Sequence, residues 1–137
     1  KTYEYRIDLS KTRKAINFEQ VTHYPYKINL ERMKEASKLL IGKHNFKAFC
    51  SAHTNVTNFE REIYDIKIKK VGNSLTFTLT GNGFLYNMVR IIVGTLLEID
   101  KVGEENIVKA LESGKRNLLG KTMPPNGLYL KNVEYNS

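Results

Sequence analysis

The stretch from Phe84 to Ile99 limits the possible folds more than any other part of this chain. Its residues are apolar almost all round a helical turn, which is typical of a helix buried between other elements. Gly81-Asn-Gly83 comes just before it and interrupts the regular structure. The sequence therefore predicts a central helix over 84–99, packed inside a layered domain with one hydrophobic core.

One charged residue, Arg90, interrupts this apolar helix between Phe84 and Leu97. A guanidinium is not deprotonated in proteins, so a buried Arg90 needs an anionic partner or a full set of hydrogen bonds. The nearest acidic residues, Glu98 and Asp100, lie eight and ten positions further on. Two interpretations stay open. Arg90 extends to solvent or pairs with a structural carboxylate, or it is a fixed cation that keeps a catalytic carboxylate ionised.

Four strands are predicted from residues that alternate between apolar and polar. In the first strand, Tyr3, Tyr5 and Ile7 fall on one face and polar side chains fall on the other. The second and third strands flank the turn at Gly72 and form a hairpin. The four strands cover residues 2–8, 61–69, 75–80 and 128–135.

Two further helices have recognisable ends. Asn29 can cap a helix over 30–41, and Gly42 supplies its left-handed stop. A second amphipathic helix covers 104–113 and ends at Gly114. The order of elements predicts a single α+β domain over 1–137, with a largely antiparallel sheet covered by helices.

The chain has 22 Lys and Arg residues against 14 Asp and Glu residues, which gives a net charge of +8. This excess favours a polyanionic partner, and nucleic acid is the leading candidate, although a basic surface also serves solubility alone. Lys67 and Lys69 lie along one predicted strand and are candidates for contacts with phosphates. A solvated face is the alternative interpretation of this pair.

The cysteine content, the apolar runs and the histidine spacing indicate the cellular compartment and the absence of a metal site. The single cysteine, Cys50, cannot form an internal disulfide, which favours the cytoplasm, and no apolar run reaches the roughly 18 residues that span a bilayer. His23, His44 and His53 lack the spacing of metal ligands, so we expect no metal. Gly81-Asn-Gly83 with Gly94 lacks the spacing of a nucleotide-binding loop, so we expect no nucleotide cofactor. The chain opens on Lys1 inside a strand pattern, and we interpret it as a piece of a longer protein.

A long string in the centre of the chain resembles a known family signature. Gly81-Asn-Gly-Phe-Leu-Tyr-Asn-Met-Val-Arg-Ile-Ile-Val-Gly94 is very similar to the signature of the TruA family of tRNA pseudouridine synthases. Further segments resemble the family in the same order: Lys1-Thr-Tyr-Glu-Tyr-Arg-Ile7, Phe46-Lys-Ala-Phe49, Arg61-Glu-Ile63 and Asn126-Gly-Leu-Tyr-Leu130. The resemblance covers nearly the whole chain and identifies it as the C-terminal domain of such an enzyme.

This resemblance implies that the enzyme isomerises uridine to pseudouridine in the anticodon stem-loop of tRNA, as a homodimer and without metal or organic cofactor. The target base is flipped from its stack, and an aspartate helps to break its glycosidic bond. Tyr3 matches the tyrosine that stacks on the base, Arg90 the arginine that pairs with the aspartate, and Leu128 the apolar pocket floor. Further residues expected to contact substrate are Tyr5, Phe49, Lys67, Lys69, Asn82, Phe84 and Asn87.

The family's nucleophilic aspartate is the feature that this chain lacks. It lies in an Arg-Thr-Asp-x-Gly-Val-His motif, which does not occur here, and Asp8, Asp65 and Asp100 stand in other contexts. We therefore expect this aspartate in an N-terminal domain and no activity from these 137 residues alone. Two alternatives remain: a noncatalytic RNA-binding module with a basic, aromatic sheet, and a structural or oligomerising domain.

Overall fold

Six strands form one open sheet in the computed structural model, which describes residues 1–12, 20–51 and 55–132. Their order is β2-β1-β5-β4-β3, and β6 pairs with β1 on the side of β2. Every pair is antiparallel except β1 with β2. The strands are β1 (Thr2–Asp8), β2 (Thr22–His23), β3 (Gly42–Asn45), β4 (Glu60–Val71), β5 (Ser74–Gly81) and β6 (Leu128–Asn132).

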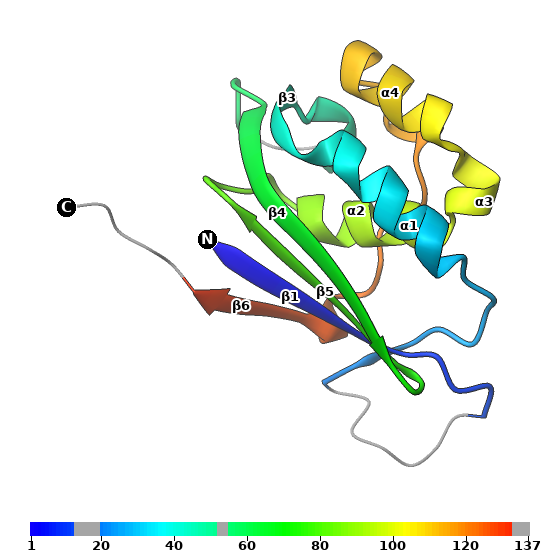
Figure 1. Ribbon diagram of the computed structural model, residues 1–137. Helices are drawn as coiled ribbons and strands as arrows, with labels where there is room; N and C mark the ends of the chain where they lie inside the picture. Colours follow the sequence, from blue (N-terminus) through cyan, green and yellow to red (C-terminus); the bar gives the residue numbers. More distant parts are fainter. Residues whose placement is uncertain (13–19, 52–54, 133–137) are drawn as a thin grey trace.

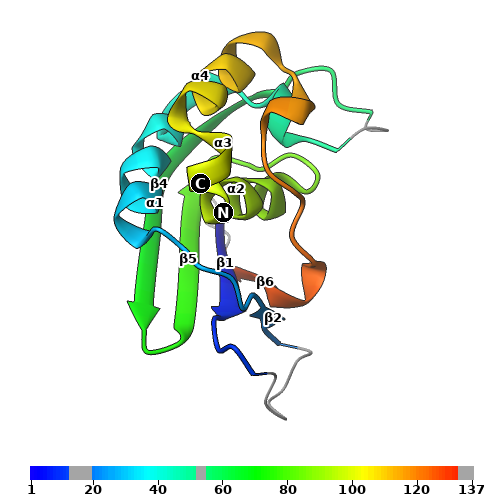
Figure 2. The same cartoon turned by 90° about the vertical axis from the view of Figure 1, so that its right-hand side faces the viewer.

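Four α-helices in the described residues lie on one side of this sheet (Figure 1). Figure 2 gives a view of the same arrangement turned by 90°. The helices are α1 (Leu30–Ser37), α2 (Met88–Leu97), α3 (Ile99–Val102) and α4 (Glu104–Ser113). The predicted α+β class, with a largely antiparallel sheet covered by helices, is confirmed. The helix predicted over 104–113 is also confirmed, and Gly114 ends it with a φ of +74°.

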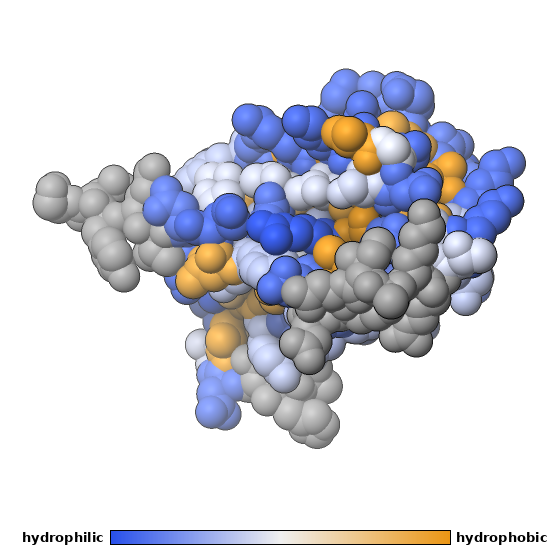
Figure 3. Space-filling view, turned by 90° about the horizontal axis from the view of Figure 1, so that it is seen from below, coloured by the Kyte–Doolittle hydropathy of each residue, from blue (hydrophilic) through white to orange (hydrophobic). Residues whose placement is uncertain are grey.

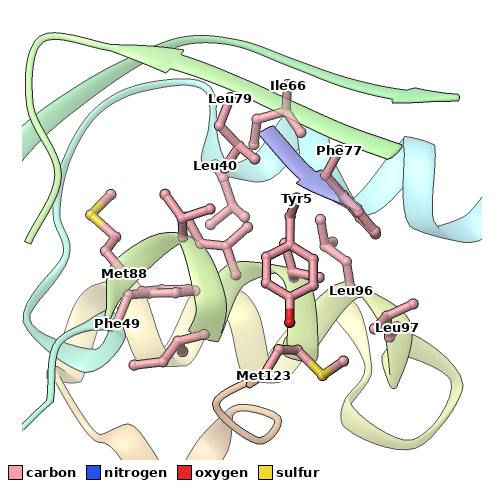
Figure 4. Close-up of a cluster of buried hydrophobic side chains, with 14 of the residues drawn as sticks. Tyr5, Leu40, Phe49, Ile66, Phe77, Leu79, Met88, Leu96, Leu97 and Met123 are labelled. Carbon is pink, nitrogen blue, oxygen red and sulfur yellow. The ribbon is translucent and has the colours of Figure 1, made fainter. Parts of the chain in front are cut away.

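The hydrophobic core lies between the strands and α2, where the alternating side chains of β1 and β5 point. Tyr5 and Ile7 from β1 are fully buried, as are Phe77 and Leu79 from β5. Figure 4 shows Tyr5 reaching down onto α2, with its hydroxyl directed toward Met123. The pattern of period two in the sequence therefore identified the buried face of both strands correctly.

The first helix begins as the sequence predicts but ends earlier. The Asn29 side chain accepts a hydrogen bond from the backbone N–H of Arg32 at 3.2 Å and caps α1. α1 ends at Ser37, and a short 3-10 turn carries the chain to Leu40. Gly42, the expected stop, instead opens β3 with a φ of +102°. Neither β3 nor β2 was predicted, because both are short and polar and are defined only by their partners.

The central helix is six residues shorter than predicted, because α2 covers Met88–Leu97 rather than 84–99. Asn87 has a φ of +63°, a left-handed conformation that cannot continue a right-handed helix. Phe84 and Leu85 therefore have no regular structure, and a turn at Tyr86 and Asn87 leads into α2. The composition alone could not reveal this break, because residues 84–86 are as apolar as those of the helix.

Two glycines bring the returning chain against α2. A Cβ on Gly94 would lie only 1.8 Å from the Lys121 carbonyl oxygen, and one on Gly120 would lie 2.7 Å from the Gly94 carbonyl oxygen. Only glycine permits this close approach of two backbones. The Met123 N–H consequently reaches the carbonyl oxygen of Arg90 at 3.2 Å. This hydrogen bond fixes the segment that precedes β6 against the helix that carries Arg90.

Polar residues dominate the surface seen from below the view of Figure 1, and hydrophobic residues form small separate areas there (Figure 3). The described helices are all too short or too polar to span a membrane. The last predicted strand is described up to Asn132, and its expected continuation to residue 135 lies outside the described residues.

Candidate active site

A hollow of about 340 Å³ opens where β1, β6 and the start of α2 meet. Tyr3 comes from β1, Leu128 from β6, and Phe84, Asn87 and Arg90 from the turn and first helical residues around 84–90. The three residues that the family resemblance assigned to catalysis therefore line one hollow, although they lie far apart in sequence. The other lining residues are Leu85, Tyr86, Met88 and Val89.

Tyr3 forms one wall of this hollow. Its ring contacts the ring of Phe84 edge to face, with centroids 5.3 Å apart and planes at 87°. The side chain is half-buried, so part of the ring stays accessible from the hollow. Phe84 lies before the start of α2, and from this position its ring supports Tyr3.

Arg90 is held in place by two oxygen atoms that carry no charge. Its Nε donates to the Met123 carbonyl oxygen at 2.6 Å, and its Nη1 donates to Asn87 Oδ1 at 2.7 Å. A guanidinium has five N–H donors, so these hydrogen bonds use two of them. No carboxylate among the described residues lies within ion-pair distance of Arg90. The charge is half-buried, fixed in orientation and not neutralised by the part of the chain that the structure describes.

The three aspartates of the chain have other partners or positions. Asp8 accepts hydrogen bonds from the backbone and hydroxyl of Ser10, at 3.0 and 2.8 Å. Asp100 pairs with Arg32 at 3.0 Å, and the side chain of Asp65 is 52% exposed on β4. None of them lines the hollow. Among the described residues there is also no cluster of His, Cys, Asp and Glu suited to a metal ion.

Leu128 contributes an apolar, half-buried surface from the first position of β6. It pairs with Tyr5 of β1 across the sheet. The preceding Gly127 packs tightly, since a Cβ there would lie 2.6 Å from the Arg6 carbonyl oxygen. The short turn Pro125–Gly127 therefore sets the position at which Leu128 enters the sheet.

Tyr5 and Phe49 are core residues, which corrects their expected place at a binding surface. The Tyr5 hydroxyl donates to the Pro124 carbonyl oxygen and shares a hydrogen bond of 2.7 Å with Thr22 Oγ1. Burial raises the pKa of Tyr5 to about 12, against the smaller effects of Thr22 and Arg90. Phe49 packs edge to face on Phe46 at 5.7 Å. Both side chains have no exposed surface, so neither is available to a base and we leave both out of the site.

Three other predicted contact residues lie outside the hollow. Asn82 is exposed at the end of β5, where its Oδ1 accepts from the backbone N–H of Glu62 at 2.9 Å. Lys67 and Lys69 project from the exposed face of β4, opposite the helices, and line a separate shallow depression with Thr76 and Thr78. Their side chains therefore belong to another surface than Arg90.

Sequence reasoning missed two residues next to Arg90. The first is Tyr86, whose side chain lines the hollow and is 65% exposed. The sequence predicted a buried helix from Phe84 onward, so Tyr86 was not expected to be exposed. The second is Ser51, whose hydroxyl accepts a hydrogen bond from Asn87 Nδ2 at 2.7 Å. No local pattern marks this serine, because it reaches the site through a hydrogen bond between residues 36 positions apart.

Comparison with known proteins gives matches that extend over the chain. A family model described as tRNA pseudouridine synthase matches residues 36–136. The tRNA pseudouridine synthase A of Anoxybacillus flavithermus is 45% identical over the whole of this chain, and that of Bacillus subtilis is 40% identical over the same extent. The protein of the same name from Streptococcus agalactiae is 44% identical over 98% of the chain.

The chain spans little more than half the length of these relatives. It corresponds to 56% of the Anoxybacillus and Bacillus proteins and to 54% of the Streptococcus protein. The family match nevertheless covers most of the chain and includes Arg90 and Leu128. By these sequence matches, the chain belongs to the tRNA pseudouridine synthase family.

Proposed function

We propose that this chain is the C-terminal domain of an enzyme that isomerises uridine to pseudouridine in the anticodon stem-loop of tRNA. It supplies one half of the active site, and an N-terminal domain of the same protein supplies the catalytic aspartate. One observation carries the proposal: Arg90 is fixed in the hollow beside Tyr3 and Leu128, with no carboxylate partner in the described residues.

The proposed role of each residue follows from its physical chemistry. Arg90 favours the ionised form of an aspartate that enters the hollow, because an opposite charge nearby lowers the pKa of a carboxyl group. Tyr3 offers a ring on which a flipped base stacks, at about 1–3 kcal/mol per base. Leu128 keeps water away from the reacting sugar. Flipping costs a few kcal/mol, which these interactions offset.

Kinetics of the full-length enzyme test the role of Arg90. The substitution Arg90→Ala should lower kcat for pseudouridine formation far more than it weakens tRNA binding, since the guanidinium acts on the catalytic carboxylate. Equal losses in rate and affinity would instead identify Arg90 as a binding or folding residue. Circular dichroism of the variant establishes that it is folded.

The isolated chain provides a second test. Because no aspartate of the chain lines the hollow, the 137 residues alone should form no pseudouridine with tRNA. Addition of the separately produced N-terminal domain should restore turnover if the two domains associate. Turnover by the isolated chain would contradict the proposed division of the active site.

The partners and compartment belong to the same proposal. The net charge of +8 supports tRNA as the polyanionic partner, and the family resemblance supports a homodimer in the cytoplasm. Affinity for tRNA should fall steeply with salt, and sedimentation of the full-length protein should give twice the mass of one chain. A noncatalytic RNA-binding sheet is disfavoured, because Tyr5 and Phe49, aromatic residues that such a module would expose, are buried.

A further inference from the structure

Asn87 connects Arg90 to a segment that is distant in sequence. Its Oδ1 accepts from Arg90 Nη1 at 2.7 Å, and its Nδ2 donates to Ser51 Oγ at 2.7 Å. Both ends of the amide are therefore occupied. Because a guanidinium can only donate, Arg90 fixes the oxygen end of the amide toward itself, and the Nδ2 end faces the Ser51 hydroxyl. The Asn87 amide therefore links the Ser51 hydroxyl to the Arg90 guanidinium.

The backbone of Asn87 has an unusual, left-handed conformation. It is the one non-glycine residue with a positive φ among the described residues, at +63°. It also occupies the N-cap position of α2, where an asparagine side chain usually accepts a backbone N–H and stabilises the helix. Here the side chain makes no such cap. The Asn87 side chain does not stabilise the helix end and instead bonds to Arg90 and Ser51.

Ser51 is itself held at a defined distance from α2. Its backbone N–H donates to the carbonyl oxygen of Tyr86 at 3.2 Å, next to Asn87. The preceding residues, Ala48 and Phe49, are fully buried in the core. The chain therefore brings Ser51 to the turn at residues 86–87, where this backbone hydrogen bond and the side-chain hydrogen bond to Asn87 hold it.

We propose that Asn87 and Ser51 are positioning residues, which hold the Arg90 guanidinium so that its remaining N–H donors stay available to a carboxylate in the hollow. This inference rests on the proposed function. It also assigns Asn87, which the sequence suggested as a substrate contact, to the support of Arg90. With Met123 at Nε and Asn87 at Nη1, the plane of the guanidinium is fixed at two points. Loss of Asn87 leaves one point, about which the group can rotate.

The test uses the full-length enzyme with Asn87→Gly, which removes the amide and tolerates the left-handed backbone. We expect kcat to fall about 10-fold to 100-fold at unchanged KM, because small misplacements of a catalytic group carry costs of this size. Ser51→Ala should give a smaller loss in the same direction, since Asn87 still reaches Arg90 but is less firmly held. Ser113→Ala, in the last turn of α4, is the matched control and should leave kcat unchanged.

A double-mutant cycle separates positioning from a general effect on folding. In the Arg90→Gln background, Asn87→Gly should cause little further loss of kcat, because the group that it positions is already gone. The acid limb of the pH profile of kcat should move to higher pH in Asn87→Gly, since a displaced cation stabilises the ionised carboxylate less. The other titratable groups around Arg90 are the phenols of Tyr3, Tyr5 and Tyr86.

The outcomes distinguish this inference from the proposed function. If Arg90→Gln itself leaves kcat intact, the proposed role of Arg90 is wrong. If Arg90→Gln lowers kcat but Asn87→Gly has no effect, or if the two losses multiply, Asn87 does not act through Arg90 and the positioning inference is overturned. A higher KM in Asn87→Gly at constant kcat would make Asn87 a substrate contact instead.

Discussion

Arg32 and Arg90 have different kinds of partner for the guanidinium group within the same domain. Arg32 on α1 finds its counter-charges within the chain. Its Nε and Nη2 contact the Glu104 carboxylate at 2.6–3.1 Å, and its Nη1 contacts Asp100 at 3.0 Å. These ion pairs lower the pKa of Glu104 and tie α1 to α3 and α4. Arg90 is bound just as closely, but only by neutral oxygens.

The two arginines differ in whether the described residues supply a counter-charge for the guanidinium. Both arginines are half-buried, but Arg32 is paired with two carboxylates, so its network connects helices and requires no further partner. Arg90 is half-buried and oriented, and its charge has no counterpart among the described residues. A cation of this kind is costly to bury, and the proposed function supplies an anion that would offset this cost.

Exchanging the two arginines for glutamine should separate activity from stability. In the full-length enzyme, Arg90→Gln should lower kcat by about 10²-fold to 10³-fold, as expected for loss of one preorganised electrostatic group. Arg32→Gln should leave kcat unchanged and lower the melting temperature, because it removes only the ion pairs between helices. Steady-state kinetics and thermal unfolding of both variants measure this. A matching loss of kcat in Arg32→Gln would remove the distinction.

Gly94→Ala should displace the backbone segment whose Met123 carbonyl oxygen holds Arg90. The added methyl would overlap the Lys121 carbonyl oxygen, so the returning segment must move away from α2 and take the Met123 oxygen with it. We expect a loss of about 3 kcal/mol in unfolding free energy, measured by urea denaturation. Gly83→Ala is the control, since its nearest neighbour is the Arg61 side chain at 3.6 Å. Comparable losses in both variants would argue against the close approach at Gly94.

Tyr5→Phe tests the buried hydrogen bonds beneath the hollow. Removal of the hydroxyl leaves Thr22 and the Pro124 carbonyl without this partner and should cost about 1–2 kcal/mol. The folded-state pKa of Tyr5, at about 12, lies above its ordinary value of 10, so the native state resists ionisation. The stability from this group is complete below pH 10 and is lost as the pH rises toward 12. Tyr5→Phe should flatten that decline in urea titrations, and an unchanged decline would assign it to other tyrosines.

The smallest effect is expected on the exposed face of β4. Lys67 and Lys69 lie away from the hollow, so they can reach only phosphates that lie outside the active site. The double substitution to alanine should weaken tRNA binding a few-fold and reduce the slope of its salt dependence by roughly one unit for each lysine that binds a phosphate. It should leave kcat unchanged. A lower kcat would place these lysines in the same functional unit as Arg90.

The sequence was most informative where a pattern repeats along one element. The alternation over 2–8 identified the buried face of β1, and Asn29 and Gly114 marked real helix ends. It was least informative where structure depends on a partner strand or on a single backbone angle. β3 has no apolar pattern of its own, and the left-handed Asn87 is hidden inside an apolar stretch.

The site divides in the same way. The isolated charge of Arg90 and the family signature were sufficient to select Tyr3, Arg90 and Leu128, which the structure brings to one hollow. Tyr5 and Phe49 resembled binding residues, but tertiary packing buried them. An aromatic side chain contributes free energy in either place, so residue type alone does not decide between a core and a surface.

By itself, the sequence determined that this chain folds around one apolar helix, carries a cation there and belongs to a family of RNA-modifying enzymes. Only the tertiary structure decided what holds that cation: a carbonyl oxygen brought close by two glycines, and an amide anchored to a serine 36 positions away. The reason is physical. Burial follows from the local periodicity of apolar residues, whereas a hydrogen bond depends on distances of a few tenths of an ångström between segments that only the folded chain brings together.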